Sequence, residues 1–376
     1  MKILILGWEF PPHSVGGLGT HTYEIVKALA KKGVEIKLIL PFKEHDDVYG
    51  VKFYSAELDR FTSIYYHIRP GQIAAGDIYS EMLWYTDAAV DIARRERFDL
   101  IHANDWLTAL AGVRIKKASG KPLLMTMHST EYDRTAGNPW EFISDYERMA
   151  VREADKVVAV SNRLKDELAS IYGADPGKIT VIHNAIDRSK FNGNKIKASS
   201  KVVLYVGRLS IQKGVDHLIR AFKIVSDHYE DAVLYIVGDG PQMQYLINLT
   251  IDLEISDKVI FFGRVPDDVL EKFYAVSSVF VMPSVSEPFG ITALESIASR
   301  TPTIISIQSG VSEVIKNVFK VDFWDSNQMA DIILGLLKYP AVKEIISSEA
   351  YRELYDLTWD NRADKFIGIY KELLKG

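Results

Sequence analysis

The feature of this 376-residue sequence that most constrains its fold is a regular alternation of short apolar runs with longer amphipathic stretches. The run Lys2–Leu6 shows little alternation of apolar and polar residues, which is typical of a parallel strand buried on both faces. A glycine-rich turn and an amphipathic stretch follow, and Gly33 fits the C-terminal cap of a helix. The same order recurs along the chain, and this βαβ rhythm predicts parallel, doubly wound sheets.

The alternation occurs in two consecutive series, which predict two α/β domains. The predicted strands are Lys2–Leu6, Val34–Leu40, Leu100–His102, Leu123–Met127, Lys156–Val160 and Ile179–Ile182, then Val202–Val206, Ala232–Val237, Val259–Phe262, Val279–Met282 and Thr303–Ser306. The polar stretch 193–200 has no apolar periodicity and predicts a linker between domains at 1–192 and 201–355. A helix is predicted over 356–376, and this helix could pack back on the first domain. Because such sheets bind ligands at the carboxyl ends of their strands, we expect a ligand in a central cleft between the domains.

Composition and charge exclude several classes of protein. The chain is 47% hydrophobic and 25% charged, an ordinary mix for a soluble protein with a large core. Its net charge of -5 argues against a broad nucleic-acid surface, and the absence of cysteine excludes disulfides, thiolate metal sites and cysteine nucleophiles. No apolar run approaches the ~18 residues of a membrane span, and the apolar Met1–Trp8 lacks a cleavage site after it. We therefore expect a cytoplasmic enzyme or binding protein.

The glycine-rich turn after the first predicted strand is a candidate ligand site. Gly16, Gly17 and Gly19 let the backbone approach a ligand closely, and the start of the following helix offers N–H groups to an anion. The turn resembles the start of a dinucleotide fingerprint, but Thr22 stands where the third glycine is required. A nicotinamide-dependent oxidoreductase is therefore the weaker alternative, and a tight turn without a ligand is another.

Two loops of the second predicted domain carry charges suited to a phosphorylated sugar. Arg208 and Lys213 lie five residues apart in GRLSIQKG, and their planar fork of donors and compact charge together suit a diphosphate. Glu287 and Glu295 flank the start of a predicted helix in SEPFGITALE. Carboxylates can accept from sugar or ribose hydroxyls and stabilise positive charge on a sugar ring. The alternative for Arg208 and Lys213 is a solvated basic loop. The alternatives for the carboxylates are a surface helix residue for Glu295 and, for Glu287, a negative charge that is favourable at a helix N-terminus.

These two loops and the turn VGDGP at 237–241 together resemble the retaining glycosyltransferases of the GT-B fold, in particular family 4 and the related glycogen and starch synthases. The likeness covers nearly the whole chain, and it includes the glycine turn at 16–19, LIHANDW at 100–106, MHS at 127–129, SGVSEV at 309–314 and VDFW at 321–324. The last two stretches resemble archaeal-type glycogen synthases. The resemblance implies two Rossmann-like domains facing a central cleft. It also implies retaining transfer of a sugar, expected to be glucose, from a nucleotide-sugar to an acceptor hydroxyl, with an α-glucan as the expected acceptor.

The resemblance further implies a role for each matching residue of the second domain. Arg208 and Lys213 would hold the donor diphosphate and stabilise the leaving group. Glu287 would lie near the donor sugar, and Glu295 would accept from the ribose of the nucleotide. The other donor-binding residues would be those at the glycine turn, at the turn that meets the base and at the helix start: Gly16, Gly17, Arg264, Val265, Phe289, Gly290 and Ile291.

In the first domain the resemblance places His128 by the reacting face of the sugar and Asp105 on the acceptor side. A buried, hydrogen-bonded histidine and a helix cap are the alternatives for these two residues. The sequence departs from the synthases at Ser14, where they commonly carry a lysine, and at Arg300, which begins an unusual turn. The chain is also shorter than typical glycogen synthases, which leaves a small sugar, a sugar phosphate or a lipid as alternative acceptors.

Expectations about the reaction mechanism also follow from the sequence. It contains no Asp-x-Asp triplet, so we expect a metal-independent reaction without a cofactor, in which the nucleotide-sugar is a substrate. No residue obviously serves as a covalent nucleophile, and family precedent favours attack by the acceptor on the same face as the departing phosphate. A regulatory protein of the same fold that binds a nucleotide-sugar without catalysis is a further alternative. Retention of all four charged residues argues against it.

Overall fold

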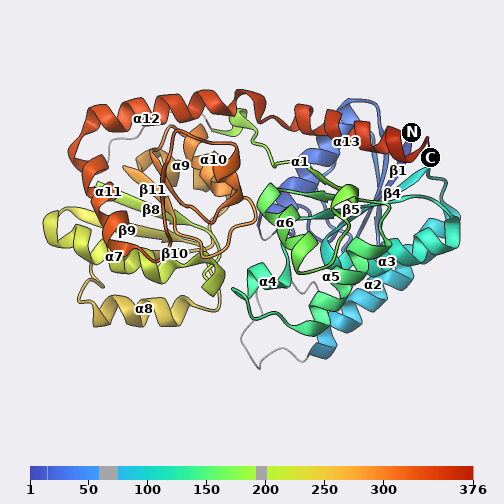
Figure 1. Cartoon of the computed structure of the whole chain (residues 1–376), viewed down its shortest axis with the longest axis horizontal. Helices are drawn as coiled ribbons and strands as arrows, with labels where there is room; N and C mark the ends of the chain where they lie inside the picture. Colours follow the sequence, from blue (N-terminus) through green and yellow to red (C-terminus); the bar gives the residue numbers. More distant parts are fainter. Residues whose placement is uncertain (15, 59–74, 192–200, 376) are drawn as a thin grey trace. The chain divides into compact units, whose positions relative to one another are not determined.

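The computed structural model describes residues 1–14, 16–58, 75–191 and 201–375. The chain divides into two compact units, shown in Figure 1. Unit 1 contains Met1–Tyr132, Gly137–Asn184 and Trp359–Gly376, and unit 2 contains Asp133–Ala136 and Ala185–Thr358. The linker predicted at 193–200 lies outside the described residues, as does Val15 of the glycine turn.

Unit 1 is built on a sheet of seven parallel strands in the order β3-β2-β1-β4-β5-β6-β7. The strands are β1 Lys2–Leu6, β2 Glu35–Leu40, β3 Val51–Ser55, β4 Leu100–Asn104, β5 Leu123–Met127, β6 Lys156–Ala159 and β7 Ile179–Val181. Ile3 of β1 pairs with Ile36 on one side and Leu100 on the other, so the order of the chain reverses between β1 and β4. Every residue of β4 and β5 is buried, because helices cover both faces of a parallel sheet.

The helices of unit 1 include the last helix of the chain. They are α1 Gly17–Lys31, α2 Ala75–Arg95, α3 Asp105–Ser119, α4 Glu131–Arg134, α5 Glu141–Glu153, α6 Asn162–Ser170 and α13 Trp359–Leu373, with α4 extending into unit 2. Helix α3 packs against both α2 and α5, and α13 packs against α1 (Figure 1). Lys31 and Lys32 pair with Asp360 and Asp364 at 3.2 and 2.8 Å. The final helix thereby completes the first unit.

Unit 2 repeats the same topology with six parallel strands in the order β10-β9-β8-β11-β12-β13. The strands are β8 Lys201–Val206, β9 Ala232–Val237, β10 Val259–Gly263, β11 Val279–Met282, β12 Thr303–Ser306 and β13 Phe319–Val321, and the helices are α7 Val215–His228, α8 Met243–Asp252, α9 Asp267–Val276, α10 Ile291–Ala298, α11 Ser326–Lys338 and α12 Pro340–Glu353. The apolar face predicted for α7 is buried in the core, including Leu218, Ile219 and Phe222. The order of the chain reverses between β8 and β11.

The structure confirms every predicted strand, with ends that differ by at most two residues. The sequence did not predict β3 and β13, which lie at sheet edges. Residues of β3 are largely half-exposed, and β13 has three residues, so neither forms the buried apolar run by which the other strands were found. The strands β3 (VKFYS) and β13 (FKV) each contain a lysine, whereas the edge strand β10 (VIFFG) is apolar and was predicted.

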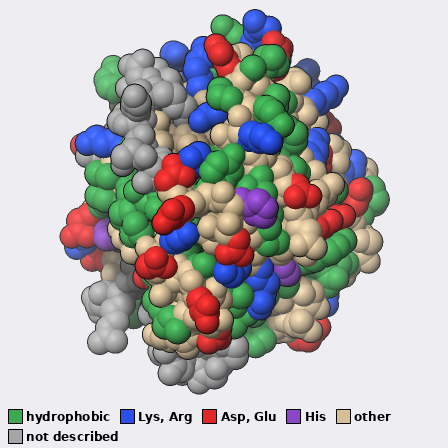
Figure 2. Space-filling model, turned by 90° about the vertical axis from the view of Figure 1, so that its left-hand side faces the viewer, with side chains coloured by type: hydrophobic (Ala, Val, Ile, Leu, Met, Phe, Trp, Pro, Cys, Tyr) green, Lys and Arg blue, Asp and Glu red, His purple; other side chains and the backbone are tan. Residues whose placement is uncertain are grey.

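The surface is mixed in charge. On the face shown in Figure 2, lysine and arginine side chains lie among aspartate and glutamate side chains, with apolar groups between them. This distribution agrees with the near balance of 45 basic and 50 acidic residues in the sequence. Within the described part of the chain, no helix combines the length and the apolar character needed to cross a membrane.

Candidate active site

The topology places the candidate residues at the point of each sheet where the strand order reverses. In unit 2 the loop with Arg208 and Lys213 follows β8, and the loop with Glu287 follows the neighbouring strand β11. In unit 1 the glycine turn follows β1, and Asp105 follows the neighbouring strand β4. Doubly wound sheets bind ligands just outside the carboxyl ends of their strands at such a point. Each unit therefore offers one ligand-binding edge, and the candidate residues lie on it.

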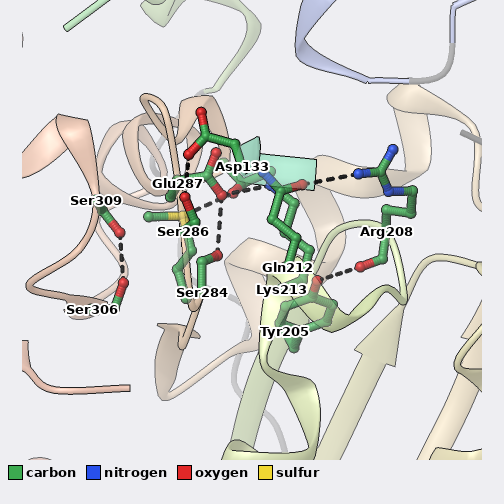
Figure 3. A network of polar contacts seen from close by, with 12 residues as sticks. Asp133, Tyr205, Arg208, Gln212, Lys213, Ser284, Ser286, Glu287, Ser306 and Ser309 are labelled. Carbon is green, nitrogen blue, oxygen red and sulfur yellow. Dashed lines mark hydrogen bonds and ion pairs between the residues drawn. The ribbon is translucent and has the colours of Figure 1, made fainter. Parts of the chain in front are cut away.

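Lys213 and Glu287 form an ion pair at this edge of unit 2 (Figure 3). The Nζ atom of Lys213 lies 2.6 Å from Oε2 of Glu287, and Ser284 Oγ donates to the same oxygen at 3.1 Å. The side chains of Lys213 and Glu287 are 20% and 10% exposed. Each charge offsets part of the cost of removing the other from water. The partly exposed lysine still has surface with which to meet an anion.

Arg208 is oriented by Gln212, a residue that the sequence did not single out. Arg208 Nη2 donates to Gln212 Oε1 at 3.0 Å, and the backbone oxygen of Gln212 accepts from Val285 N at 2.9 Å. Gln212 is buried, so it joins the loop after β8 to the loop after β11 from within (Figure 3). The hydroxyl of Tyr205 donates to the backbone oxygen of Arg208 at 2.8 Å. Burial raises the pKa of Tyr205 far above its usual value, which keeps the phenol protonated as a donor.

Two glycines allow these loops to approach each other. Gly214 and Gly290 have φ of 58° and 107°, a region that disfavours residues with a Cβ atom. A Cβ atom at Gly214 would lie 2.3 Å from the backbone oxygen of Pro283, and one at Gly290 would lie 2.7 Å from Met282 Cε. Gly290 is also the N-cap of α10, whose first turn has N–H groups without partners within the helix. The predicted backbone donors Phe289, Gly290 and Ile291 lie at this helix start.

The Glu287 loop is fixed by contacts from outside its own motif. Glu287 N donates to the backbone oxygen of Gln308 at 3.2 Å, and its carbonyl oxygen accepts from Gly310 N at 2.9 Å. Ser286 Oγ donates to Asp133 Oδ1, in a segment that joins unit 2 from the first half of the chain (Figure 3). Neither Gln308 nor Asp133 could be found from sequence spacing, because both reach the loop only through the tertiary fold.

Glu295, Arg264 and Val265 lie further along the same sheet. Glu295, in α10, is partly exposed, and its Oε2 accepts from the hydroxyl of Tyr274 at 2.8 Å. Arg264 and Val265 follow β10, which is separated from β8 by β9. Gly238 N donates to the oxygen of Gly263 at 2.8 Å and anchors the turn that carries them. The structure thus pairs Lys213 with Glu287 directly, and it ties Glu295 to α9, the helix that follows the predicted base turn.

In unit 1 the structure brings Asp105 and His128 together. Asp105 Oδ1 accepts from the backbone N of His128 at 2.7 Å, and Asn104 Oδ1 lies 3.4 Å from His128 Nε2. Asp105 is the first residue of α3 and has a φ of 55°, while Asn104 holds the N-cap position. Asp105 is therefore not the residue at the N-cap position of α3. Its carboxylate instead fixes the end of β5, from which His128 extends.

The glycine turn begins α1. Gly16 is the N-cap and Gly17 the first residue of the helix, and both are exposed. Gly19 packs against Ser14 so closely that a Cβ atom at Gly19 would lie 2.0 Å from Ser14 Oγ. The small serine at position 14 therefore fits a turn that is tightly closed on itself.

Three histidines meet beneath this edge of unit 1. The ring of His21 lies 4.4 Å from that of His128 between centroids, and His21 Nδ1 lies 2.8 Å from Asn184 Oδ1. His102 Nδ1 lies 2.8 Å from the hydroxyl of Tyr370. Burial lowers the pKa of His21 to about 4 and of His102 to about 3, and it holds the pKa of His128 well below its usual value. All three rings are neutral at pH 7. The glycine-rich motif predicts no role for His21, although this residue lies within it.

Among residues 1–14, 16–58, 75–191 and 201–375, no three histidine or acidic side chains are grouped in a way that could hold a metal ion. The charged residues that the sequence predicts for the site of unit 2 include two cations and two carboxylates: Arg208, Lys213, Glu287 and Glu295.

Comparison with known proteins identifies the family. Residues 15–190 match the family described as Glycosyltransferase Family 4, and residues 187–353 match Glycosyl transferases group 1. An uncharacterized glycosyltransferase of Methanocaldococcus jannaschii is 32% identical over 396 residues, covering 99% of this chain and 98% of that protein. The chain is a GT-B glycosyltransferase.

Proteins named for more specific activities are also similar to this glycosyltransferase. A glycogen synthase of Mycobacterium tuberculosis is 28% identical over 84% of this chain and 80% of that protein. The solved structure of sucrose-phosphate synthase from Thermosynechococcus elongatus covers 100% of the glycosyltransferase and 99% of its own chain, with a TM-score of 0.84 and 21% identity. At that identity the likeness concerns the fold, and it agrees with two Rossmann-like units.

Proposed function

We propose that this glycosyltransferase transfers glucose from a nucleotide-sugar to an α-glucan hydroxyl, with retention of the anomeric configuration and without a metal ion or a cofactor. The observation that carries the proposal is the ion pair of the partly exposed Lys213 with the buried Glu287, in the loops that also carry Arg208, at the carboxyl edge of the sheet of unit 2. The two cations are suited to bind a diphosphate ester, and the carboxylate is suited to contact a sugar ring.

The proposed reaction breaks the bond between the sugar C1 and the diphosphate oxygen, and the electron pair leaves with the phosphate. The acceptor hydroxyl bonds to C1 on the face that the phosphate leaves, and its proton passes to the departing phosphate oxygen. Arg208 and Lys213 stabilise the negative charge that develops there, and the N-terminus of α10 adds its partial positive charge. Glu287 stabilises positive charge on the sugar ring. In the proposed reaction Glu287 acts through its charge, and no residue has to serve as a covalent nucleophile.

The residues of unit 1 take the acceptor side in this proposal. His128 is neutral because burial lowers its pKa, so its ring can offer one donor and one acceptor to sugar hydroxyls. Asp105 holds the backbone of His128 and thereby its position. The α-glucan acceptor is supported by the likeness to the glycogen synthase of Mycobacterium tuberculosis.

The test measures release of nucleoside diphosphate from ADP-glucose, UDP-glucose and GDP-mannose, each with and without glycogen, in the presence of EDTA. We expect glycogen to stimulate release from one glucose donor, and proton NMR of the product to show an α-linkage. Slow release that glycogen does not stimulate would move the acceptor to a small sugar, a sugar phosphate or a lipid. Release that requires added magnesium would contradict metal independence, and no release from any donor by folded protein would contradict the proposed donor chemistry.

A further inference from the structure

Tyr274 is a buried tyrosine whose hydroxyl reaches a carboxylate of the candidate site. It lies in α9, and its side chain is 0% exposed. Its hydroxyl donates to Glu295 Oε2 at 2.8 Å, whereas Glu295 itself is partly exposed. A buried hydroxyl that bonds to a carboxylate at the surface ties that carboxylate to the core of unit 2.

The ring of Tyr274 is held from several sides. Phe280 of β11 and Phe191 contact it at centroid distances of 5.6 and 6.2 Å, with interplanar angles of 63° and 72°. Its backbone oxygen accepts from Thr301 Oγ1 at 2.8 Å. A tyrosine side chain has only two main torsions, so packing of this kind leaves the hydroxyl with one direction. That direction is toward Glu295.

The bond has a defined donor and acceptor. Burial, and then the charge of Glu295, raises the pKa of Tyr274 well above its usual value, so the phenol stays protonated. The carboxylate accepts, and a hydrogen bond to an ionised acceptor is stronger than one between neutral groups. One oxygen of Glu295 is thereby fixed, which fixes the plane and rotamer of the whole carboxylate.

We propose that Tyr274 is a positioning residue for the donor nucleotide, because it orients the Glu295 carboxylate to accept from the ribose hydroxyls. The inference rests on the proposed function, which places the ribose at Glu295. Tyr274 is itself buried and acts only through Glu295. Its helix α9 follows the turn with Arg264 and Val265, so it also links the place expected for the base to the place expected for the ribose.

The test measures binding of ADP and UDP by calorimetry, each beside its 2′,3′-dideoxy analogue, which lacks both ribose hydroxyls. The nucleotide that the unmodified protein binds more tightly is used for the comparison. We expect this nucleotide to bind about tenfold more tightly than its 2′,3′-dideoxy analogue, a ratio typical of hydrogen bonds to a charged group. Tyr274→Phe removes only the hydroxyl. It should reduce this preference to about two- to threefold, while kcat at saturating donor changes by less than about twofold.

Three further variants separate positioning from stability. Glu295→Gln should also lose the ribose preference, and the double variant should be no worse than Glu295→Gln alone, because Tyr274 acts through Glu295. Tyr370→Phe is the matched control, since Tyr370 is a buried tyrosine whose hydroxyl contacts His102 in unit 1. It should lower the melting temperature and keep the ribose preference.

A Tyr274→Phe protein with an unchanged ribose preference, beside a Glu295→Gln protein that has lost it, would overturn the inference and leave the proposed function in place. If Tyr274→Phe does not fold, Glu295→Asp replaces it, because the shorter side chain withdraws the carboxylate from Tyr274 and keeps its charge. Glu295→Asp should then lose the preference, and an unchanged preference would overturn the inference. If neither ADP nor UDP binds the unmodified protein, both the inference and the proposed nucleotide donor fail for these bases.

Discussion

Lys213 illustrates how a charge can be placed before a ligand arrives. A lysine side chain has many rotamers, and ordering it costs conformational entropy of about 2 kcal/mol. In this structure the ion pair with Glu287 and the neighbouring Ser284 already hold its Nζ atom in one place. A diphosphate that binds there meets an ordered cation. Part of the entropy cost of ordering the lysine side chain has therefore already been met when the protein folds, and it does not add to the cost of binding.

Replacement of Lys213 by alanine should therefore lower kcat strongly. The loss of one preorganised donor to a developing negative charge typically costs about 2.7–4 kcal/mol, or about 10²–10³ in kcat. Steady-state release of nucleoside diphosphate measures this change. The control is Lys223→Ala, because Lys223 forms a surface pair with Asp227 at 2.8 Å in α7. Near-normal turnover of the Lys213→Ala protein would contradict the assigned role.

At this scale the sequence predicts charges better than it predicts their partners. Arg208, Lys213, Glu287 and Glu295 follow from the motifs alone, and the structure places the first three in the loops after the neighbouring strands β8 and β11 and the fourth in the helix that follows. The contact of Gln212 with Arg208 could not be predicted from the sequence, because nothing about a glutamine in a basic loop indicates which residue it will contact. Asp133 lies 153 positions from Ser286, and only the fold brings them into contact.

The loops after the strands of unit 2 are built on glycines that have no room for a side chain. Gly238 follows β9 with a φ of 136°, and a Cβ atom there would lie 1.9 Å from the backbone oxygen of Gly207. A clash with a flexible side chain could relax, but this one is with the backbone of the loop that carries Arg208. The contact therefore sets how closely the loops after β8 and β9 can lie.

Gly238→Ala should lower the free energy of unfolding of unit 2 by about 2–5 kcal/mol, from backbone strain and overpacking together. Urea denaturation monitored by circular dichroism measures it. Gly335→Ala is the matched substitution, because Gly335 lies within α11 and a Cβ atom there would meet nothing within 4 Å. It should stabilise the protein by about 0.5–1 kcal/mol, since alanine favours the helix. A Gly238→Ala protein as stable as Gly335→Ala would refute the packing argument.

Elements were predictable where burial imposed a pattern. The central strands are uniformly apolar because helices cover both faces, and their sequence shows it without ambiguity. The edge strands β3 and β13 lack that constraint and were missed. The packing partner of α13 was also undetermined, because the amphipathic pattern of a helix shows which face is buried and does not show against what. Its contacts with α1 are a property of the tertiary structure.

For the molecule as a whole, the buried histidines predict that unit 1 is sensitive to acid. His21 and His102 have lowered pKa values of about 4 and about 3 when folded, against about 6.5 when unfolded. Their contribution to stability is complete above pH 6.5 and is lost as the pH falls below it, because the unfolded chain binds protons that the folded chain excludes. Between pH 6.5 and 5 each should cost unit 1 about 2 kcal/mol.

Tryptophan fluorescence during urea denaturation at pH 7.5 and pH 5.0 measures this loss. Five of the six tryptophans belong to unit 1 and only Trp324 to unit 2, so the signal reports mainly on the unit that holds the histidines. His102→Gln removes one of the histidine titrations and should leave a smaller difference in stability between the two pH values. Equal unfolding midpoints at both values in the unmodified protein would show that these rings do not control its stability.

The position of α13 in unit 1 has a consequence for biosynthesis. The ribosome releases the strands of the first unit, then makes all of residues 185–358, and only afterwards supplies the helix that packs on α1 and brings Tyr370 to His102. At about 5–20 residues per second, that interval is roughly 10–30 s. Until then the apolar residues of α13 that are buried in the folded protein, including Trp359 and Phe366, are not yet made, and the surface of α1 that they cover stays exposed. The unit that is translated first is therefore the one that finishes folding last.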